Sequence, residues 1–563
     1  MYAPKSLRKF STTFAPSPLT TPLLLIVAVG IVLSLPTAVQ AQYTFGDWAS
    51  DRGYQPGDAM PSVVFSTFRH PKITDLAGIG DYNWNVTPTI YLGLDTNNIS
   101  SIESDAFSGL TNLTSLSLIG NDIASIESGD FNGLTNLVSM NLYANEIASI
   151  ETGTFSGLTK LNDLKLSDNN ITSVQSGTFS GLSNLTLLNL NDNLLTNIAP
   201  GTFSELTNLT ALILTSNDIS NIESGDCSGL TNLTTLYLDR NSIASIESNT
   251  FSEMTKLTKL NLDANDTVNI ESGAFSGLGN LTTLTLSFNS IASLESGDFH
   301  GLTKLTSIRL AYNLISNIEA DAFSGLTNLT SLDLQYNNLT SIKRSDFSGL
   351  TNLTTLALNN NQISNIESGA FSELTNLTML YLNENPQLTN LYLDEADLSH
   401  ITYLVVNGSN ITSVSLRNTV LSQTSLEMMF SSIARLPGVT ELNLSGVDFS
   451  PITDLSPLGS MDDVTDLWLL DVANMDATDL DALLDELSAM EGSAIEGVLY
   501  LTQADYDAFN ADGGGLLAIW DAESGHHVQI VPEPATMTLL ALGGLAILRN
   551  HRKSTWGSIG VRP

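Results

Sequence analysis

Glutamates recur in this chain at a spacing of 24 residues, and carboxylates are side chains that could bind a metal or transfer protons. Ca²⁺ favours carboxylate oxygens but takes about six to eight oxygen ligands. The series supplies one carboxylate per repeat, and the sequence contains no Asp-rich calcium-binding loop. We therefore predict a solvent-exposed acidic stripe without a metal site. The stripe consists of Glu103, Glu127, Glu151, Glu223, Glu247, Glu271, Glu295, Glu319 and Glu367.

Other residues that could support catalysis are few. Cys227 is the only cysteine, which excludes an internal disulfide, and it stands at a position where neighbouring repeats have Phe. We expect it to be a buried core thiol. His526 and His527 are the only adjacent histidines and are expected to lie in a solvated linker. The motifs HExxH, GxSxG and GxxxxGK[ST] do not occur, so the sequence predicts no catalytic residue and no cofactor.

Aromatic and basic side chains mark a candidate binding surface. Phe288, Tyr312 and Tyr336 stand at one position in three successive repeats, each just before a recurring Asn. Elsewhere the residues expected on this surface are Ser, Thr, Asn, Asp and Ala, and aromatic and Arg side chains on such a background are typical of binding hot spots. The alternative is an aromatic stack that only stabilises the sheet. The full set of candidates adds Arg309, Tyr237 and Arg240.

An Asn repeated every 24 residues organises the elements that must position these side chains. A fixed period in this range predicts stacked repeats, because one repeat cannot bury its own apolar side chains. Each repeat follows the frame LxxLxLxxNxIxxIExxxFxGLTN, in which the LxL alternation predicts a short strand and the rest a return path. The series runs through Asn97, Asn121, Asn145, Asn169, Asn193, Asn217, Asn241, Asn265, Asn289, Asn313, Asn337, Asn361 and Asn385.

The recurring Asn is itself predicted to point inward. A buried amide is tolerated only when it is hydrogen-bonded, and the sharp turn after each strand leaves backbone groups that need partners. We expect Asn241, in the middle of the series, to be more important for stability than Asn385 at its end. A second Asn, in the recurring triplet NLT, fits the repeat consensus better than glycosylation.

The charge of the chain excludes one class of partner. Its 59 acidic and 21 basic residues give a formal net charge of −38. Nucleic-acid binding depends on clusters of Lys and Arg that neutralise phosphates, and such clusters are absent. We therefore predict no nucleic-acid partner.

The two ends of the chain resemble targeting signals. Residues 1–41 combine Lys5, Arg8 and Lys9 with an apolar segment and small residues before an expected cut after Ala41, which is the layout of a secretory signal peptide. At the other end, Pro532, Glu533 and Pro534 precede an apolar run, and Arg549, Arg552 and Lys553 follow it. This three-part order in residues 532–553 is similar to the PEP-CTERM sorting signal of Gram-negative bacteria, and 554–563 form a tail.

That resemblance implies how the protein is handled during export. It implies processing by an exosortase and association with the cell surface or with an exopolysaccharide matrix. The apolar run, which is shorter than the roughly 20 residues of a membrane-spanning helix, would contact the membrane before processing.

The repeat frame resembles that of leucine-rich repeat proteins of the 24-residue type. The resemblance implies an α/β solenoid, curved, with a continuous parallel sheet on the concave face and loops and short helical turns on the convex face. We expect an N-terminal cap at 42–88, regular repeats at 89–387, degenerate repeats at 388–475 and a C-terminal cap at 476–531, which includes a short amphipathic helix.

These features predict an exported, non-catalytic protein at the cell surface or in the extracellular matrix. We expect it to bind a protein or polysaccharide through its concave face. Two alternatives remain open: a surface hydrolase with its site in 388–531, and a purely structural matrix scaffold.

Overall fold

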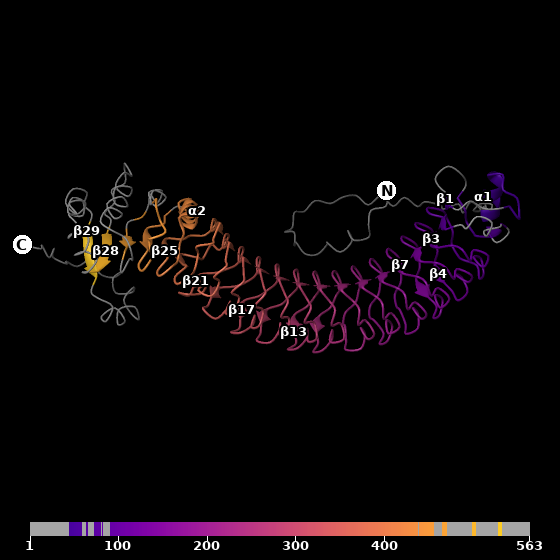
Figure 1. Ribbon diagram of the computed structural model, residues 1–563, viewed down its shortest axis with the longest axis horizontal. Coiled ribbons are helices and arrows are strands. Elements are labelled where there is room, and N and C mark those ends of the chain that lie inside the picture. The colour runs from indigo at the N-terminus through magenta and orange to yellow at the C-terminus, as the bar shows by residue number, and fades with distance from the viewer. Residues whose placement is uncertain are drawn as a thin grey trace, which may run out of the picture. The chain divides into compact units, whose positions relative to one another are not determined.

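The protein is described by a computed structural model (Figure 1). The chain divides into two compact units. The first unit comprises residues 1–291 and 298–305, and the second comprises 292–297 and 306–563. The residues that the structure describes are 44–58, 63–65, 72–79, 82, 90–436, 438–454, 464, 466–469, 498–502 and 527–531.

In the first unit, three-residue strands stack side by side into one parallel sheet. In each regular repeat the central Leu or Met of the strand is buried and its two neighbours face outward, as the LxL alternation predicts. The labelled strands β3 and β7 lie on the inner side of the bend of this unit (Figure 1). In order, the strands are β1 (Val63–Phe65), β2 (Tyr91–Gly93), β3 (Ser115–Ser117), β5 (Ser139–Asn141), β7 (Asp163–Lys165), β8 (Leu187–Asn189), β9 (Ala211–Ile213), β10 (Thr235–Tyr237), β12 (Lys259–Asn261) and β14 (Thr283–Thr285).

The return path of a repeat carries a shorter strand in several layers. These two-residue strands pair in parallel with the equivalent strand one repeat later, and the remainder of the path consists of turns rather than helix. In the first unit they are β4 (Ser125–Ile126) with β6 (Ser149–Ile150) and β11 (Ser245–Ile246) with β13 (Asn269–Ile270). In the second unit they are β15 (Ser293–Leu294) with β17 (Asn317–Ile318) and β19 (Ser341–Ile342) with β21 (Asn365–Ile366).

The second unit contains two larger parallel sheets. The strands β16 (Ser307–Arg309), β18 (Ser331–Asp333), β20 (Thr355–Ala357), β22 (Met379–Tyr381) and β24 (Tyr403–Val405) form the first of them. The other contains β23 (Asn390–Tyr392), β25 (Ser413–Ser415), β26 (Glu441–Asn443), β27 (Asp466–Trp468), β28 (Val498–Thr502) and β29 (His527–Val531).

Among the described strands of the degenerate repeats, only β24 therefore extends the first of these sheets, and the others belong to the second. Strand β23 lies next to the two-residue strand β21, so the second sheet continues the row of return-path strands. Helix α2 (Gln423–Ile433) packs against β24, and a capping box at Ser422 starts it. The LxL pattern in 388–475 has the same form in a strand of the main sheet and in a strand of the return-path row. The sequence therefore could not show to which of the two rows these strands belong.

The core is a column of Leu, Ile and Phe side chains. One Phe per layer stacks on the Phe of the next, for example Phe131 on Phe155 with ring centroids 5.8 Å apart. Cys227 takes this position in its own layer and is 5% exposed, so the prediction of a buried core thiol is confirmed. Burial, aided by Asp226 and Glu253, raises the pKa of its thiol to about 12. A protonated thiol in this environment is a poor nucleophile.

The recurring Asn forms an inner row of hydrogen bonds, as predicted. Every Asn of the series is buried. The amide nitrogen Nδ2 of Asn241 donates to the carbonyl oxygens of Leu238 (2.9 Å) in its own layer and Leu214 (3.0 Å) in the preceding layer, while its Oδ1 accepts the backbone N–H of Ile219 (3.1 Å). Each amide thus joins two layers and satisfies groups that the turn would leave unpaired.

The expectation that Asn385 matters less is wrong in its geometric premise. Asn385 is fully buried, donates to the carbonyl oxygens of Leu358 (3.1 Å) and Leu382 (2.8 Å), and accepts the backbone N–H of Ile363 (3.0 Å). The layers continue through β24, so Asn385 is in the interior of its unit rather than at a frayed end.

The residue before each inner Asn adopts a left-handed backbone conformation. Its φ lies near +55° in Ala264, Phe288 and Tyr312, among others, and Gly occurs in this position only at Gly120. L-residues disfavour this region, so each layer holds one strained residue at the turn after its strand.

The ends of the repeat array are described only in part. In the N-terminal segment, helix α1 (Phe45–Asp51) starts at a capping box on Thr44 and buries Phe45 and Trp48, and β1 pairs with β2. The signal peptide, the amphipathic helix expected within 476–531 and the sorting signal lie outside the described residues. Within the described part of the chain, no helix has the length and apolar character needed to cross a membrane.

Candidate functional site

The acidic stripe lies on the surface and links layers. All nine glutamates of the stripe are exposed. The carboxylate of Glu151 accepts the backbone N–H of Ser128 (3.0 Å), and that of Glu367 accepts the backbone N–H of Arg344 (3.0 Å), in each case from the preceding layer. No cluster of three or more potential metal ligands occurs among the described residues. The stripe thus has a structural role at some positions that the sequence analysis did not anticipate.

The aromatic candidates lie in the turn after their strand, not at its last residue. Strand β16 ends at Arg309 and β18 at Asp333, three residues before Tyr312 and Tyr336 respectively. Tyr312 is 40% exposed and Tyr336 is 41% exposed. Both residues have a left-handed backbone conformation (φ 57° and 54°), and they occupy equivalent turns of adjacent layers.

Tyr312 and Tyr336 stack face to face in the second unit. Their ring centroids are 4.2 Å apart and their planes differ by 9°. The pKa of the Tyr312 phenol is raised by partial desolvation, and further by the neighbouring Tyr336 and Asp333. The stack agrees with the stabilising alternative, but two partly exposed rings also present a flat apolar surface to solvent.

Arg309 gives this pair a charged neighbourhood. It is exposed at the end of β16, and its register partner on β18 is Asp333. Burial raises the pKa of the Asp333 carboxyl, whereas hydrogen bonds from Gln335 and the charge of Arg309 oppose that rise. The guanidinium is exposed on the strand that leads into the Tyr312 turn, and its N–H donors suit a carboxylate or hydroxyl.

The remaining sequence candidates belong to the first unit. Phe288 lies in the turn after β14 and is 54% exposed, Tyr237 is half-buried at the end of β10, and Arg240 is exposed in the turn that follows. Tyr237 and Arg240 are not neighbours of the Tyr312–Tyr336 pair in sequence or in strand order. Among the candidates in the second unit, the structure brings Tyr312 and Tyr336 into contact, and Arg309 stands three residues before Tyr312.

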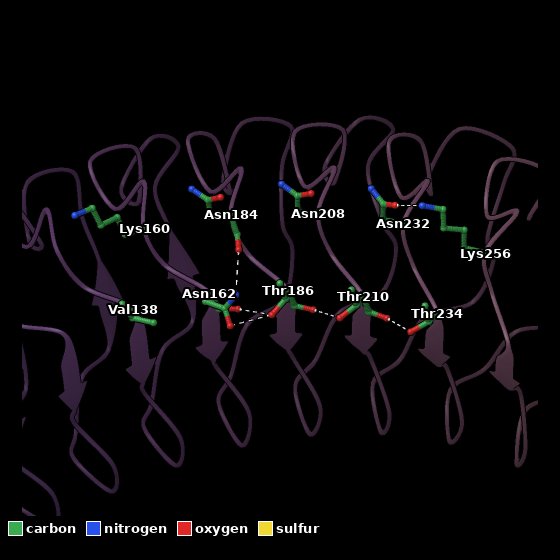
Figure 2. Close-up of a pocket in the computed structure, with 10 residues that line it drawn as sticks. All are labelled: Val138, Lys160, Asn162, Asn184, Thr186, Asn208, Thr210, Asn232, Thr234 and Lys256. Carbon is green, nitrogen blue, oxygen red and sulfur yellow. Dashed lines mark hydrogen bonds between the residues drawn. The ribbon is translucent and has the colours of Figure 1, made fainter.

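A groove that the sequence analysis missed runs along the starts of strands in the first unit (Figure 2). It has a volume of about 930 Å³. One wall carries the Asn of the NLT triplets, and the other carries the residues just before the strands. The lining residues are Val138, Lys160, Asn162, Asn184, Thr186, Asn208, Thr210, Asn232, Thr234 and Lys256.

Two rows of side-chain hydrogen bonds build the walls of this groove. In the first row, the amide of each Asn donates to the backbone carbonyl of the preceding layer, as from Asn208 to Ser183 (2.8 Å). In the second row, each hydroxyl donates to the carbonyl of the residue one repeat earlier, as from Thr210 to Thr186 (3.0 Å; Figure 2). The sequence signal for this groove was the triplet NLT, repeated with a period of 24 residues. The depth of the groove, however, depends on how the layers stack.

A second missed feature is an aromatic pair in the sheet of degenerate repeats. Trp468 on β27 and Tyr500 on β28 are register partners, and their rings stack with centroids 3.6 Å apart and planes 3° apart. Glu441 and Asp466 are register partners on the adjoining strands β26 and β27. The outward position of the LxL alternation in 464–469 was the signal that could have identified Trp468.

Family comparisons agree with the repeat geometry. The leucine-rich repeat family matches in overlapping segments from residue 90 to residue 411, and the PEP-CTERM protein-sorting motif matches residues 531–553. That motif includes all six sorting-signal residues predicted from the sequence, namely Pro532, Glu533, Pro534, Arg549, Arg552 and Lys553. No curated protein matches this chain.

Solved structures provide a comparison of the fold. An internalin from Listeria monocytogenes is 23% identical, with 57% of this chain and 82% of the internalin covered and a TM-score of 0.42. The functional domain of InlJ from the same organism is 22% identical, with 67% and 79% covered and a TM-score of 0.39. A chain of the glycosylated Toll–Spatzle complex from Drosophila is 20% identical, with a TM-score of 0.51, and this chain spans 58% of its length and is itself 75% covered. At such identities the likeness concerns the fold alone.

Proposed function

We propose that this chain, which belongs to the leucine-rich repeat family and carries a PEP-CTERM sorting motif, is an exported, non-catalytic protein that binds a protein or polysaccharide at the surface formed by Tyr312, Tyr336 and Arg309. Leucine-rich repeat proteins typically act as protein-binding scaffolds. The observation that carries the proposal is the stack of two rings, each about two-fifths exposed, in the turns that follow β16 and β18, with the exposed Arg309 at the end of β16.

The chemistry of this surface suits recognition. Tyr and Arg are enriched among the residues that contribute most to binding, because each combines a broad apolar face with a polar group. The stacked rings restrain each other, so less side-chain freedom is lost when a ligand orders them. The guanidinium can bind a carboxylate of a protein or of an acidic sugar in a two-pronged geometry.

Export determines which partners the surface would meet. The sorting motif indicates passage through the cell envelope to the surface, with an exosortase-type enzyme as the processing partner. We propose a final location at the cell surface or in the extracellular matrix of a Gram-negative-type bacterium. Deleting residues 532–553 should release the protein into the medium. Unchanged retention at the cell surface would contradict the role assigned to this segment.

A capture experiment tests the binding surface. The exported protein is used to recover ligands from surface extracts and from a panel of glycans, in parallel with the double variant Tyr312→Ser/Tyr336→Ser. The variant should capture markedly less of the ligand that the wild type recovers. Tyr143→Ser is the matched control, because Tyr143 is 43% exposed in the first unit and lies outside this surface. Equal capture by the double variant would move the binding site elsewhere.

The hydrolase alternative now has specific candidate residues. Glu441 and Asp466 face each other on neighbouring strands, which lie about 5 Å apart, beside the Trp468–Tyr500 stack. Retaining glycosidases use two carboxylates at a separation of about 5 Å. Incubation of the captured glycans with wild type and with Glu441→Gln tests this alternative. Hydrolysis that the variant abolishes would replace the non-catalytic proposal.

The scaffold alternative predicts a different result. A purely structural matrix protein would recover no ligand, and neither would its surface variants. In that case the tyrosine pair would contribute only to stability, and the double variant would unfold at a lower denaturant concentration without any change in capture.

A further inference from the structure

We infer that the groove of the first unit is a second binding site and that its ligand is an extended acidic polysaccharide. The groove lies before the strands, whereas the tyrosine pair lies after the strands of the other unit, so the two sites involve different residues. The inference rests on the charge of the groove, on its hydrogen-bonding groups and on its length.

The charge of the groove is opposite to that of the protein. The chain has a formal net charge of −38, yet no carboxylate lines the groove and Lys160 and Lys256 lie at its two ends. Each ammonium donates to a neutral amide oxygen, of Asn136 and Asn232 respectively, and neither lysine is in an ion pair among the described residues. An ammonium has three N–H donors, so both lysines keep donors for an anion.

The wall between the lysines is rich in acceptors. The amides of Asn184 and Asn208 use Nδ2 to donate to the preceding layer, and no donor from the described residues reaches their Oδ1 atoms. The hydroxyl protons of Thr186 and Thr210 are directed along the row, which leaves oxygen lone pairs toward the groove. A ligand that fits must therefore supply many donors, as the hydroxyl groups of a sugar chain do.

A polypeptide fits this site less well. An extended peptide binds to a sheet by adding a strand at a free edge. Strand β8 is already paired with β7 and β9, and the neighbouring strands along the groove are likewise paired on both sides. No backbone edge is available beneath the groove, and a peptide offers only one backbone donor per residue.

The length of the groove requires an extended ligand. Lys160 and Lys256 are four repeats apart, and neighbouring strands are separated by about 5 Å, so the two charges are about 20 Å apart along the stack. An oligosaccharide of several sugars with acidic groups along its length can contact both lysines while its hydroxyl groups meet the intervening amide and hydroxyl oxygens. The exposed methyl groups of Val138 offer an apolar contact at one end.

The test is a binding titration of the full chain with a defined uronic-acid oligosaccharide, repeated with its neutral analogue and with an extended acidic peptide of equal charge. The variant Lys160→Gln/Lys256→Gln removes both positive charges from exposed positions. It is compared with Lys304→Gln, since Lys304 occupies the same position of another repeat, donates to Asn280 (2.7 Å) in the same way and does not line the groove.

We expect the uronic-acid oligosaccharide to bind more tightly than the other two probes, with an affinity that falls as salt is added. The double variant should weaken binding on the order of tenfold, because two exposed charge pairs are lost and each contributes up to about fivefold in affinity. Lys304→Gln should have no effect. Absence of binding, tighter binding of the peptide or of the neutral analogue, or an equal loss in Lys304→Gln would each overturn the inference.

Discussion

Two rows of asparagine run through the repeats, with the same residue type and the same period but in different surroundings. The inner row, which includes Asn241, is buried and each amide bonds to two layers through both its nitrogen and its oxygen. The outer row, which includes Asn208, is at the surface and donates one bond to the preceding layer. Both rows join neighbouring layers. Removal of the inner row would leave buried backbone groups with neither a protein partner nor water, whereas removal of the outer row would not. The same residue type therefore stabilises the fold in one place and is available for binding in the other.

The largest expected effect comes from the inner row. Asn241→Ala should lower the free energy of unfolding by about 1–3 kcal/mol, because it leaves buried carbonyl and N–H groups without partners. Asn208→Ala should change it by less than about 0.5 kcal/mol, since water replaces an exposed bond. Urea unfolding of the two variants measures the difference. Similar losses in both would remove the distinction between the rows.

Asn385→Ala sharpens the same comparison at the end of the series. Because Asn385 is fully buried with the same hydrogen bonds as Asn241, its replacement should cost a comparable 1–3 kcal/mol or so. Urea unfolding monitored in the second unit provides the measurement. A negligible loss would instead support a frayed boundary near residue 387.

Asp130 tests a buried carboxylate in the return path. It is 2% exposed and accepts the backbone N–H of Glu127 (2.8 Å), and burial is the main reason why its pKa is raised from 3.8 to about 6. The folded state therefore holds the proton more tightly than the unfolded state. The stability contributed by this group is complete below pH 3.8 and is lost as the pH rises through about 6.

Replacing Asp130 with Thr, which occupies this position in Thr154 and Thr178, should therefore stabilise the protein near neutral pH. The gain over wild type should shrink as the pH falls from about 6 toward 3.8. Unfolding midpoints of both proteins across this range provide the measurement. Asp226→Thr, where burial also raises the pKa, repeats the test in another layer. A gain that grows on acidification would contradict the assigned cause.

The smallest effect concerns the left-handed residue that precedes each inner Asn. Ala264 has φ +55°, and a change to Gly should stabilise the protein by up to about 1 kcal/mol, because relief of the strained conformation exceeds the added freedom of the unfolded chain. Gly120→Ala reverses the experiment at φ +66° and should destabilise by a similar amount. Thermal unfolding of the pair gives the sign. Destabilisation by Ala264→Gly would mean that the turn is not strained.

Much of the fold was predictable because the same residue pattern recurs in every repeat. The period places Leu, Phe and Asn at fixed positions, so the strands, the core and the inner row all follow from one alignment, and Cys227 is recognised as a core residue by its position. The left-handed turns were not predictable from residue type, since only Gly120, Asp168, Asp192 and Asn360 among the residues at this position are types that favour such a conformation.

The site and the end of the array were less predictable for geometric reasons. The groove exists because exposed residues from several layers form two facing rows, and no single repeat contains it. Helix α2 could have been recognised from the buried spacing of Leu426, Met429, Phe430 and Ile433 after Ser422. The sequence could not show that the strands of the degenerate repeats continue the row of return-path strands, because an LxL alternation has the same form in either row.

The most direct test of the proposed function is a calorimetric titration of the captured ligand into the wild type and into Tyr312→Ser/Tyr336→Ser, with the unfolding midpoint measured on the same samples. If the exposed pair anchors the ligand while the inner row maintains the fold, binding should weaken by about 2 kcal/mol, or roughly thirtyfold, with little change in the midpoint. Unchanged affinity, or a large fall in the midpoint that accounts for the loss of binding, would contradict this account.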